Sequence, residues 1–156
     1  MEDVEVRLGP VVTHVGLCVS DLARSEAFYT AGLGFTRLSD LAPPDEVIER
    51  LLRVPAPVGL TAVYLGCGPF VLELLHFARP GNAPARERPF TEPGLTHLSL
   101  TVDDLAATRR RVAAHGGNVL ADTDIGVAVL ALDPDGQVLE LIGRSRPRPQ
   151  ESDDDE

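Results

Sequence analysis

Short runs of hydrophobic residues, of a length typical of strands, alternate along this chain with more polar, helix-like stretches. Residues 11–19 are rich in valine and are predicted to form a buried strand. Ser20 and Asp21 then offer an N-cap, so a helix is predicted over residues 22–30, ending near Gly32. Further along, strands are expected at residues 35–38, 60–65 and 69–77, a turn at residues 66–68 and a short helix at residues 45–53.

The same order of elements returns in the second half of the chain. A strand is predicted at residues 96–102, followed by a helix that is capped by Asp103 or Asp104 and runs to about His115. Three more strands are expected at residues 118–120, 127–132 and 137–142, with a turn at residues 133–136.

Two pairs of matching segments indicate that the second half is a copy of the first. THVGLCVSDLA at residues 13–23 aligns with THLSLTVDDLA at residues 96–106, and seven of the eleven positions are identical. VLEL occurs at residues 71–74 and again at residues 138–141. A histidine-bearing strand, a helix and a glutamate-bearing strand therefore occur twice in the same order, which is typical of a duplicated supersecondary unit.

The repeat divides the chain into two modules of an α+β fold. We expect an N-terminal extension at residues 1–10, a first module at residues 11–78 and a second module at residues 95–143. Residues 79–94 contain four prolines and two glycines and are predicted to link the modules. Residues 144–156, rich in proline and charge, are predicted to form a disordered acidic tail.

Charge and composition narrow the classes of partner. The 156 residues carry a formal net charge of -10, which argues against nucleic acid, because phosphate binding needs clustered Lys and Arg. No apolar run approaches the roughly 20 residues that span a bilayer, so no membrane association is expected. Cys18 and Cys67 are too few for a disulfide framework, and the N-terminus lacks the features of a secretory signal, so a cytoplasmic location is expected.

Strand periodicity places the histidines on faces that carry small side chains. Because alternate residues of a strand point to opposite faces, His14 shares its face with Gly16 and Cys18. His97 likewise shares its face with Ser99 and Thr101. The large aliphatic residues between them point the other way, where a helix can cover them, so the histidine faces are predicted to border a cavity.

The two glutamates in the repeated VLEL segments are the other candidates for chemistry. Glu73 and Glu140 each lie between leucines, where an unpaired carboxylate would carry a large desolvation penalty. Together with His14 and His97 they form a set of two nitrogen and two oxygen donors that suits one divalent ion of Zn, Ni, Co, Mn or Fe. The alternative is that the histidines are satisfied core residues and the glutamates lie at exposed edges. The occurrence of the pattern in both copies favours the metal site.

Other side chains of the same strands are candidates for a substrate pocket. Tyr64 can donate a hydrogen bond from its strand. The full set expected to line the pocket is Cys18, Tyr64, Leu75, Phe77, Ser99 and Thr101.

Residues 11–143 resemble the vicinal oxygen chelate superfamily, which includes glyoxalase I, methylmalonyl-CoA epimerase, extradiol dioxygenases, fosfomycin resistance enzymes and bleomycin-binding proteins. The segments that carry the resemblance are THVGLCVSDLARSEAFYTAGLGF, VLELLHF, GLTHLSLTVDDL and DPDGQVLELI. The resemblance implies two βαβββ modules in tandem, whose curved sheets form a cup around a metal ion. It also implies that the ligands are His14, Glu73, His97 and Glu140, and glutamate at both module ends resembles the glyoxalase and epimerase branch.

This resemblance implies a metal-dependent epimerase, isomerase or lyase. Such an enzyme removes a proton next to a carbonyl of a small-molecule substrate while the metal stabilises the enolate, with Glu73 and Glu140 as the residues that transfer the proton. The alternatives are a glyoxalase I-like lactoylglutathione lyase, an Fe(II) ring-cleaving dioxygenase and a non-catalytic binding or resistance protein. The sequence leaves open whether the modules pair within one chain or between the two chains of a homodimer.

Overall fold

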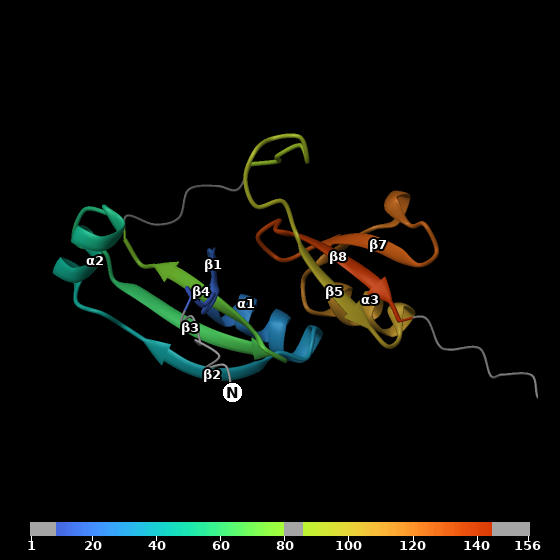
Figure 1. The fold of residues 1–156 in the computed structure, drawn as a ribbon, viewed down its shortest axis with the longest axis horizontal. Helices are drawn as coiled ribbons and strands as arrows, with labels where there is room; N and C mark the ends of the chain where they lie inside the picture. The colour runs from blue at the N-terminus through green and yellow to red at the C-terminus, as the bar shows by residue number, and fades with distance from the viewer. Residues whose placement is uncertain (1–8, 80–85, 145–156) are drawn as a thin grey trace, which may run out of the picture. The chain divides into compact units, whose positions relative to one another are not determined.

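The computed structural model describes residues 9–79 and 86–144, and these residues divide into two compact units (Figure 1). The first unit contains strands β1 to β4 with helices α1 and α2, and the second contains strands β5 to β8 with helix α3. Most of the expected N-terminal extension and acidic tail, and part of the expected linker, lie outside the described residues. Among the described helices, none has the length and hydropathy needed to cross a lipid bilayer.

The first unit is a four-stranded mixed sheet with strand order β1-β4-β3-β2. β1 is parallel to β4, and the other neighbouring pairs are antiparallel. In chain order its elements are β1 Val15–Cys18, α1 Leu22–Ala27, a π-helical segment Phe28–Gly32, β2 Thr36–Leu41, α2 Asp45–Leu52, β3 Leu60–Cys67 and β4 Phe70–Phe77.

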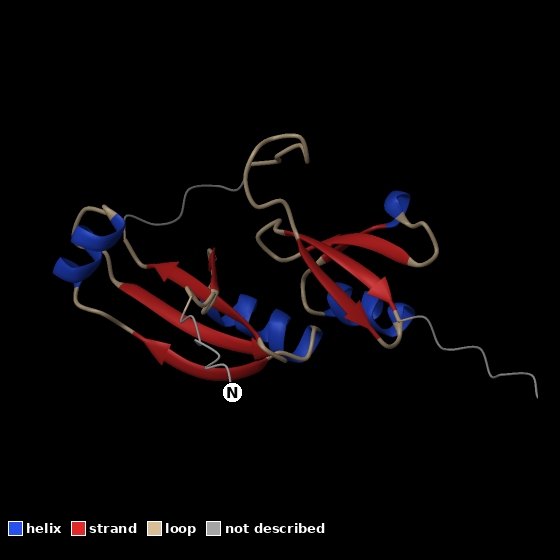
Figure 2. Ribbon diagram, in the orientation of Figure 1, coloured by secondary structure: helices blue, strands red, loops and turns tan. Residues whose placement is uncertain are grey.

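The second unit repeats this topology with strand order β5-β8-β7-β6 (Figure 2). β5 is again parallel to the last strand of its unit, and the remaining pairs are antiparallel. Its elements are β5 Leu98–Val102, α3 Leu105–Ala114, β6 Asn118–Leu120, a 3-10 segment Ala121–Thr123, β7 Ala128–Leu132 and β8 Val138–Gly143. The α+β class and the two tandem βαβββ modules predicted from the sequence are therefore confirmed.

Each unit buries one face of its sheet. Leu72 and Leu74 of β4, and Leu139 and Leu141 of β8, are fully buried. Because side chains alternate along a strand, the residue between each pair of leucines points to the opposite face. This alternation turns the two repeated glutamates away from the core.

The helices begin where the sequence predicts, at equivalent positions of the repeat. The Asp21 carboxylate accepts a hydrogen bond from Arg24 N at 3.0 Å, and the Asp104 carboxylate accepts one from Ala107 N at 2.8 Å. Each is a side-chain N-cap that satisfies a backbone donor of the first helical turn. The helix predicted over residues 22–30 with an end near Gly32 is confirmed as helical, although it is α-helical only to Ala27 and continues as a π-helical segment from Phe28 to Gly32.

The first strand of each module is shorter than predicted. The strands expected from residues 11 and 96 begin at Val15 and Leu98. β1 and β5 are edge strands with one neighbour each, and their pairing begins with Val15 opposite Leu72 and Leu98 opposite Leu139. His14 and His97 consequently occupy the residue immediately before their strands.

Helix α2 covers one end of the first sheet, where it follows the prolines of residues 43–44. The Asp45 carboxylate accepts hydrogen bonds from Val58 N and Gly59 N, both at 2.9 Å, which tie the first helical turn to the loop before β3. Ile48 of the helix packs with Val58 and Leu60 in a buried hydrophobic cluster. The predicted turn at residues 66–68 falls later in the structure, because β3 continues to Cys67 and β4 begins at Phe70.

Candidate metal site

The first pair of expected ligands lies together in the first unit. β1 runs parallel to β4 with Gly16 opposite Glu73, so the residue before the strand reaches the same carboxylate. His14 Nε2 lies 3.2 Å from Glu73 Oε2, and the glutamate side chain is largely buried, with 13% of it exposed. We call His14 and Glu73 the first ligand pair.

The second unit repeats the arrangement at equivalent positions. Ser99 stands opposite Glu140 in the register of β5 and β8. His97 Nε2 lies 3.7 Å from Glu140 Oε2, and this glutamate is more open, with 35% of its side chain exposed. We call His97 and Glu140 the second ligand pair.

A threonine precedes each histidine and contacts its other ring nitrogen. Thr13 Oγ1 lies 3.0 Å from His14 Nδ1, and Thr96 Oγ1 lies 2.9 Å from His97 Nδ1. Such a hydrogen bond can keep the proton on Nδ1 and leave Nε2 with its lone pair toward the carboxylate. The two threonines were not among the predicted site residues, but the Thr-His dipeptide that occurs in both copies of the repeat could have identified them.

The spacing within each pair fits two donors of one divalent ion. Two donors that each lie about 2.1 Å from an ion are about 3.0 Å apart at a right angle and about 3.4 Å apart at the tetrahedral angle. The nitrogen-to-oxygen distances of 3.2 and 3.7 Å are close to this range. Neutral imidazole and carboxylate are also the donor types that divalent transition metals accept. Within the part of the chain that the structure describes, no three such side chains gather, so the four expected ligands occur as two pairs.

Tyr64 makes a contact that the sequence did not predict. Its hydroxyl donates to Glu73 Oε1 at 2.6 Å, and Tyr64 stands directly opposite Glu73 in the register of β3 and β4. The hydrogen bond to Glu73, with a smaller contribution from burial, raises the pKa of Tyr64 to about 12, so the phenol stays protonated as a donor. The ring also meets the His14 ring edge-on, with centroids 5.5 Å apart.

The second ligand pair has different neighbours. Ser99 Oγ donates to Glu140 Oε2 at 2.7 Å. Phe90, from the segment before β5, lies against the His97 ring with centroids 5.7 Å apart and an interplanar angle of 40°. This contact could not be predicted from the sequence, because Phe90 falls in the region predicted to be a linker.

The remaining expected pocket residues lie on the strands that carry the ligands. Leu75 and Phe77 share the face of Glu73 by strand alternation, and both are partly buried against the cluster beneath α2. Cys18 and Thr101 are exposed on β1 and β5. Neither Cys18 nor Cys67 forms a disulfide.

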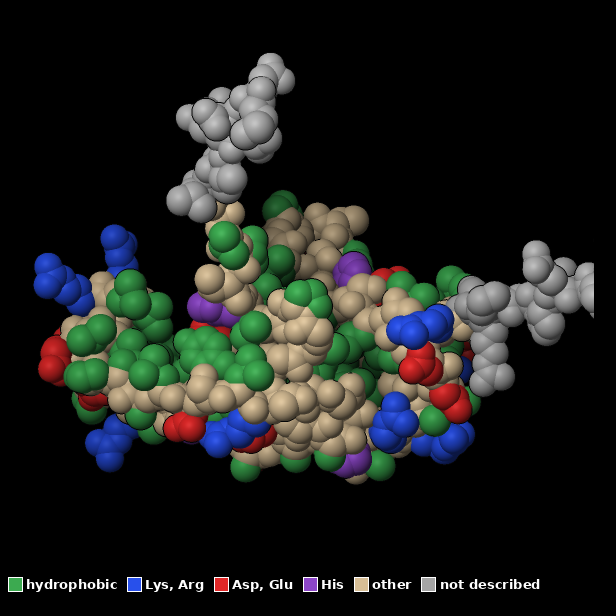
Figure 3. Space-filling view, turned by 60° about the horizontal axis from the view of Figure 1, so that its bottom comes forward, with side chains coloured by type: hydrophobic (Ala, Val, Ile, Leu, Met, Phe, Trp, Pro, Cys, Tyr) green, Lys and Arg blue, Asp and Glu red, His purple; other side chains and the backbone are tan. Residues whose placement is uncertain are grey.

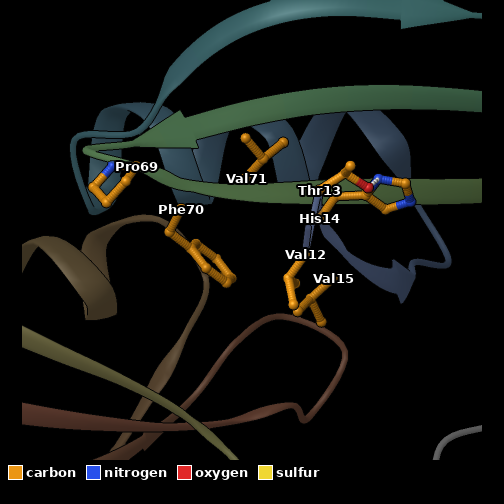
Figure 4. A pocket seen from close by; sticks show the side chains of 7 residues that line it. All are labelled: Val12, Thr13, His14, Val15, Pro69, Phe70 and Val71. Atoms are coloured by element: carbon orange, nitrogen blue, oxygen red, sulfur yellow. Dashed lines mark hydrogen bonds between the residues drawn. The ribbon is translucent and has the colours of Figure 1, made fainter. Parts of the chain in front are cut away.

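A cavity of about 290 Å³ opens beside the first ligand pair (Figure 4). His14 and Thr13 form part of its wall, and the close-up shows the phenyl ring of Phe70 across from Val12 and Val15. The complete lining is Val12, Thr13, His14, Val15, Pro69, Phe70 and Val71. None of the six residues expected to line the pocket belongs to this set.

Exposed hydrophobic side chains gather on the first unit, at the left of Figure 3. Leu41 stands opposite Ala62 in the register of β2 and β3, two residues from Tyr64, so it shares the face of the first ligand pair. Leu38 also reaches this face, because its side chain lies over Gly66. The carboxylate of Glu73 is therefore bordered by an apolar surface.

Comparisons with known proteins identify the family of this chain. The family model described as "Glyoxalase/Bleomycin resistance protein/Dioxygenase superfamily" matches residues 11–142. The chain is 33% identical to the Escherichia coli (strain K12) "Uncharacterized protein YaeR" over 137 residues, which cover 83% of this chain and 93% of that protein. It is 32% identical over 146 residues to an Arabidopsis thaliana "Probable lactoylglutathione lyase, chloroplastic"; these cover 88% of this chain but only 36% of that longer protein.

Among solved structures, a glyoxalase family protein from Bacillus cereus superposes with a TM-score of 0.74 at 16% identity, covering 88% of this chain and 97% of the other. At that identity the likeness shows the fold alone, and the fold is the tandem βαβββ arrangement described above. The family match over most of the chain and the relative with one-third identity lead to one conclusion: the chain belongs to the glyoxalase/bleomycin resistance protein/dioxygenase superfamily, the vicinal oxygen chelate superfamily.

Proposed function

We propose that this protein is a metal-dependent lyase, isomerase or epimerase that removes a proton next to a carbonyl of a small-molecule substrate. The observation that carries the proposal is the imidazole–carboxylate pair found at the same position of both units, with nitrogen-to-oxygen distances of 3.2 and 3.7 Å. In the proposal, His14, Glu73, His97 and Glu140 ligate a single divalent ion.

The histidines and the glutamates have different roles in this proposal. A divalent ion held by them would supply Lewis-acid stabilisation of the negative charge that develops on a substrate oxygen. The two imidazoles act as oriented ligands, because a threonine contacts Nδ1 of each ring. The carboxylates can also accept and return a proton. Return to the opposite face of the same carbon gives an epimer, and return to the neighbouring carbon gives an isomer.

A glyoxalase-type reaction is the more specific form of this proposal. It is supported by the 32% identity with a plant protein named as a probable lactoylglutathione lyase. A ring-cleaving dioxygenase would need only three of the four ligands and would leave Glu73 unused. The contacts of Glu73 with both His14 and Tyr64 favour a role for it at the metal.

The first test is metal content, metal affinity and solvent-deuterium exchange, measured anaerobically on the purified protein. We expect one tightly held divalent ion and metal-dependent exchange of deuterium into hemithioacetals, 2-substituted acyl thioesters or ketoses. His97→Ala should reduce metal affinity strongly. His76→Ala is the matched control, because His76 points to the face opposite Glu73 in the same sheet. The proposal is refuted if the protein binds no metal or if the His97→Ala variant has unchanged metal affinity. Oxygen uptake with catechols would instead support the ring-cleaving dioxygenase.

The assembly of the four ligands is tested separately. Each unit holds one ligand pair, so the proposal requires two units from one chain or from two chains of a homodimer. Mixing a His14→Ala variant with a His97→Ala variant distinguishes the cases, since only exchange between chains can rebuild an intact set of four. Recovery of metal binding supports a homodimer, and no recovery supports pairing within one chain.

A further inference from the structure

The two glutamates occupy equivalent positions but differ in which neighbouring strand supplies a hydroxyl group. In the first unit, Glu73 stands between Gly16 of β1 and Tyr64 of β3. In the second unit, Glu140 stands between Ser99 of β5 and Leu130 of β7. In the first unit the neighbour with a hydroxyl group is Tyr64, on the inner strand β3. In the second unit it is Ser99, on the edge strand β5.

This difference determines which carboxylate oxygen accepts the hydrogen bond from the neighbouring hydroxyl group. Tyr64 donates to Glu73 Oε1 while His14 lies beside Oε2, so the two oxygens of this carboxylate are engaged by different groups. Ser99 donates to Glu140 Oε2, the same oxygen that faces His97. Among the described residues, none donates a hydrogen bond to Glu140 Oε1, and this side chain is the more exposed of the two, at 35% against 13%.

We propose that Tyr64 is a positioning residue that fixes the Glu73 carboxylate in its ligating orientation, so that the first ligand pair is preformed and the second is adjustable. This inference rests on the proposed metal site and extends it. Tyr64 donates to Oε1, the oxygen that does not face His14, so Oε2 stays turned toward the histidine and little ordering remains to be done when a ligand binds. The hydrogen bond to Glu140 is on the oxygen that faces His97, so its other oxygen keeps more freedom and can adapt to what is bound.

Tyr64 has two properties that suit this role. Its hydroxyl donates to Glu73 Oε1 at 2.6 Å from the position directly opposite Glu73 on the neighbouring strand, so the contact spans the two strands. Its ring is packed edge-on against His14, so one side chain touches both members of the first ligand pair. Gly16 occupies the position that Ser99 has in the other unit; a Cβ there would lie 3.6 Å from Glu73 Oε2 and 3.2 Å from Leu75 Cδ1, so a serine requires a small shift of the leucine side chain.

The test removes the hydroxyl and then restores it from the other strand. Tyr64→Phe keeps the ring and is expected to weaken metal affinity by about 10- to 100-fold, as for the loss of a hydrogen bond to a charged group. It should also change the visible spectrum of the Co(II)-loaded protein, which reports on coordination and needs no substrate. Gly16→Ser in the Tyr64→Phe background places a hydroxyl where the second unit has Ser99, and is expected to restore most of the affinity and the original spectrum.

Controls separate this role from a contribution to folding. A Cβ at position 16 would approach Leu75 Cδ1 at 3.2 Å, so Gly16→Ala in the Tyr64→Phe background measures the effect of crowding without a hydroxyl. Gly16→Ala should restore nothing. If Tyr64→Phe leaves both affinity and spectrum unchanged while His97→Ala abolishes binding, the metal site stands and the positioning role is wrong. If neither variant alters metal binding, the proposed function itself fails.

Discussion

Replacing the threonine before each histidine tests the metal site without removing a ligand. In Thr13→Val the methyl groups fill nearly the same volume, but the 3.0 Å contact with His14 Nδ1 is lost. The ring can then rotate, and its proton can move to Nε2, the nitrogen that must ligate. Thr96→Val makes the same change at the 2.9 Å contact with His97.

The magnitude follows from the exposure of these contacts. Loss of a group that orients a metal-bound histidine costs roughly 10- to 100-fold in affinity. Both threonine–histidine contacts are exposed, so water can replace part of the hydroxyl's role, and the lower end of the range applies. We therefore expect about a tenfold loss of affinity for each variant, which corresponds to about 1.4 kcal/mol.

The assay is competition for Zn²⁺ or Co²⁺ against a chromophoric chelator, with the protein's thermal unfolding followed in parallel. Thr61→Val is the control, because Thr61 pairs with His76 in the sheet and points away from the ligand pairs. Its affinity should equal that of the unsubstituted protein. If Thr13→Val and Thr96→Val both bind metal as well as Thr61→Val does, the orientation argument is wrong, and the histidines are held by something other than their threonines.

Three further changes probe the fold and the surroundings of the site. Leu141→Ala removes a fully buried side chain and should destabilise the protein by about 2–5 kcal/mol in urea unfolding, whereas Leu51→Ala, at a position 72% exposed, should stay within about 0.5 kcal/mol. The backbone hydrogen bonds from Gly59 and Val58 lower the pKa of Asp45, so its charged form favours folding above the ordinary carboxyl pKa, and this contribution disappears as the pH falls through the lowered value. Asp45→Asn should remove that part of the acid sensitivity of unfolding. Phe90→Ala should leave metal affinity within about threefold and raise the KM for an apolar substrate, because the ring lies beside His97 and donates no ligand.

The repeat explains how much of the fold could be predicted. Two copies of one pattern reveal the element order twice, and strand alternation then assigns each glutamate to the face away from the leucine core. The ends of the elements could not be obtained in this way. Valine-rich sequence continues through residues 11–14, but β1 begins at Val15, opposite Leu72, although its neighbour β4 begins two residues earlier, at Phe70.

The carboxylate contacts depend on register, which is why they were missed. A hairpin turn centred on Cys67, as predicted from the glycines beside it, would place Thr61 opposite Glu73. The turn in the structure lies later, at residues 68–69, and this brings Tyr64 opposite Glu73 instead. A hydrogen bond across two strands therefore depended on a shift in the turn that composition alone does not determine.

Comparison of the two copies of the repeat distinguishes two classes of residue. The proposed metal ligands are the same in both units, and the residues beside them differ. Thr-His before the first strand and Glu in the last strand are the same in both units, as expected if one ion requires like donors from each. The neighbours of the two glutamates differ: Glu73 has Tyr64 beside it and is largely buried, whereas Glu140 has Leu130 beside it and is more exposed. A substrate bound at such a site would meet unlike surroundings on its two sides. Transferring the Tyr64 arrangement to the second unit, as Ser99→Gly with Leu130→Tyr, should therefore retain metal binding but lower kcat more than it changes KM. An unchanged kcat would mean that freedom of the second carboxylate has no part in turnover.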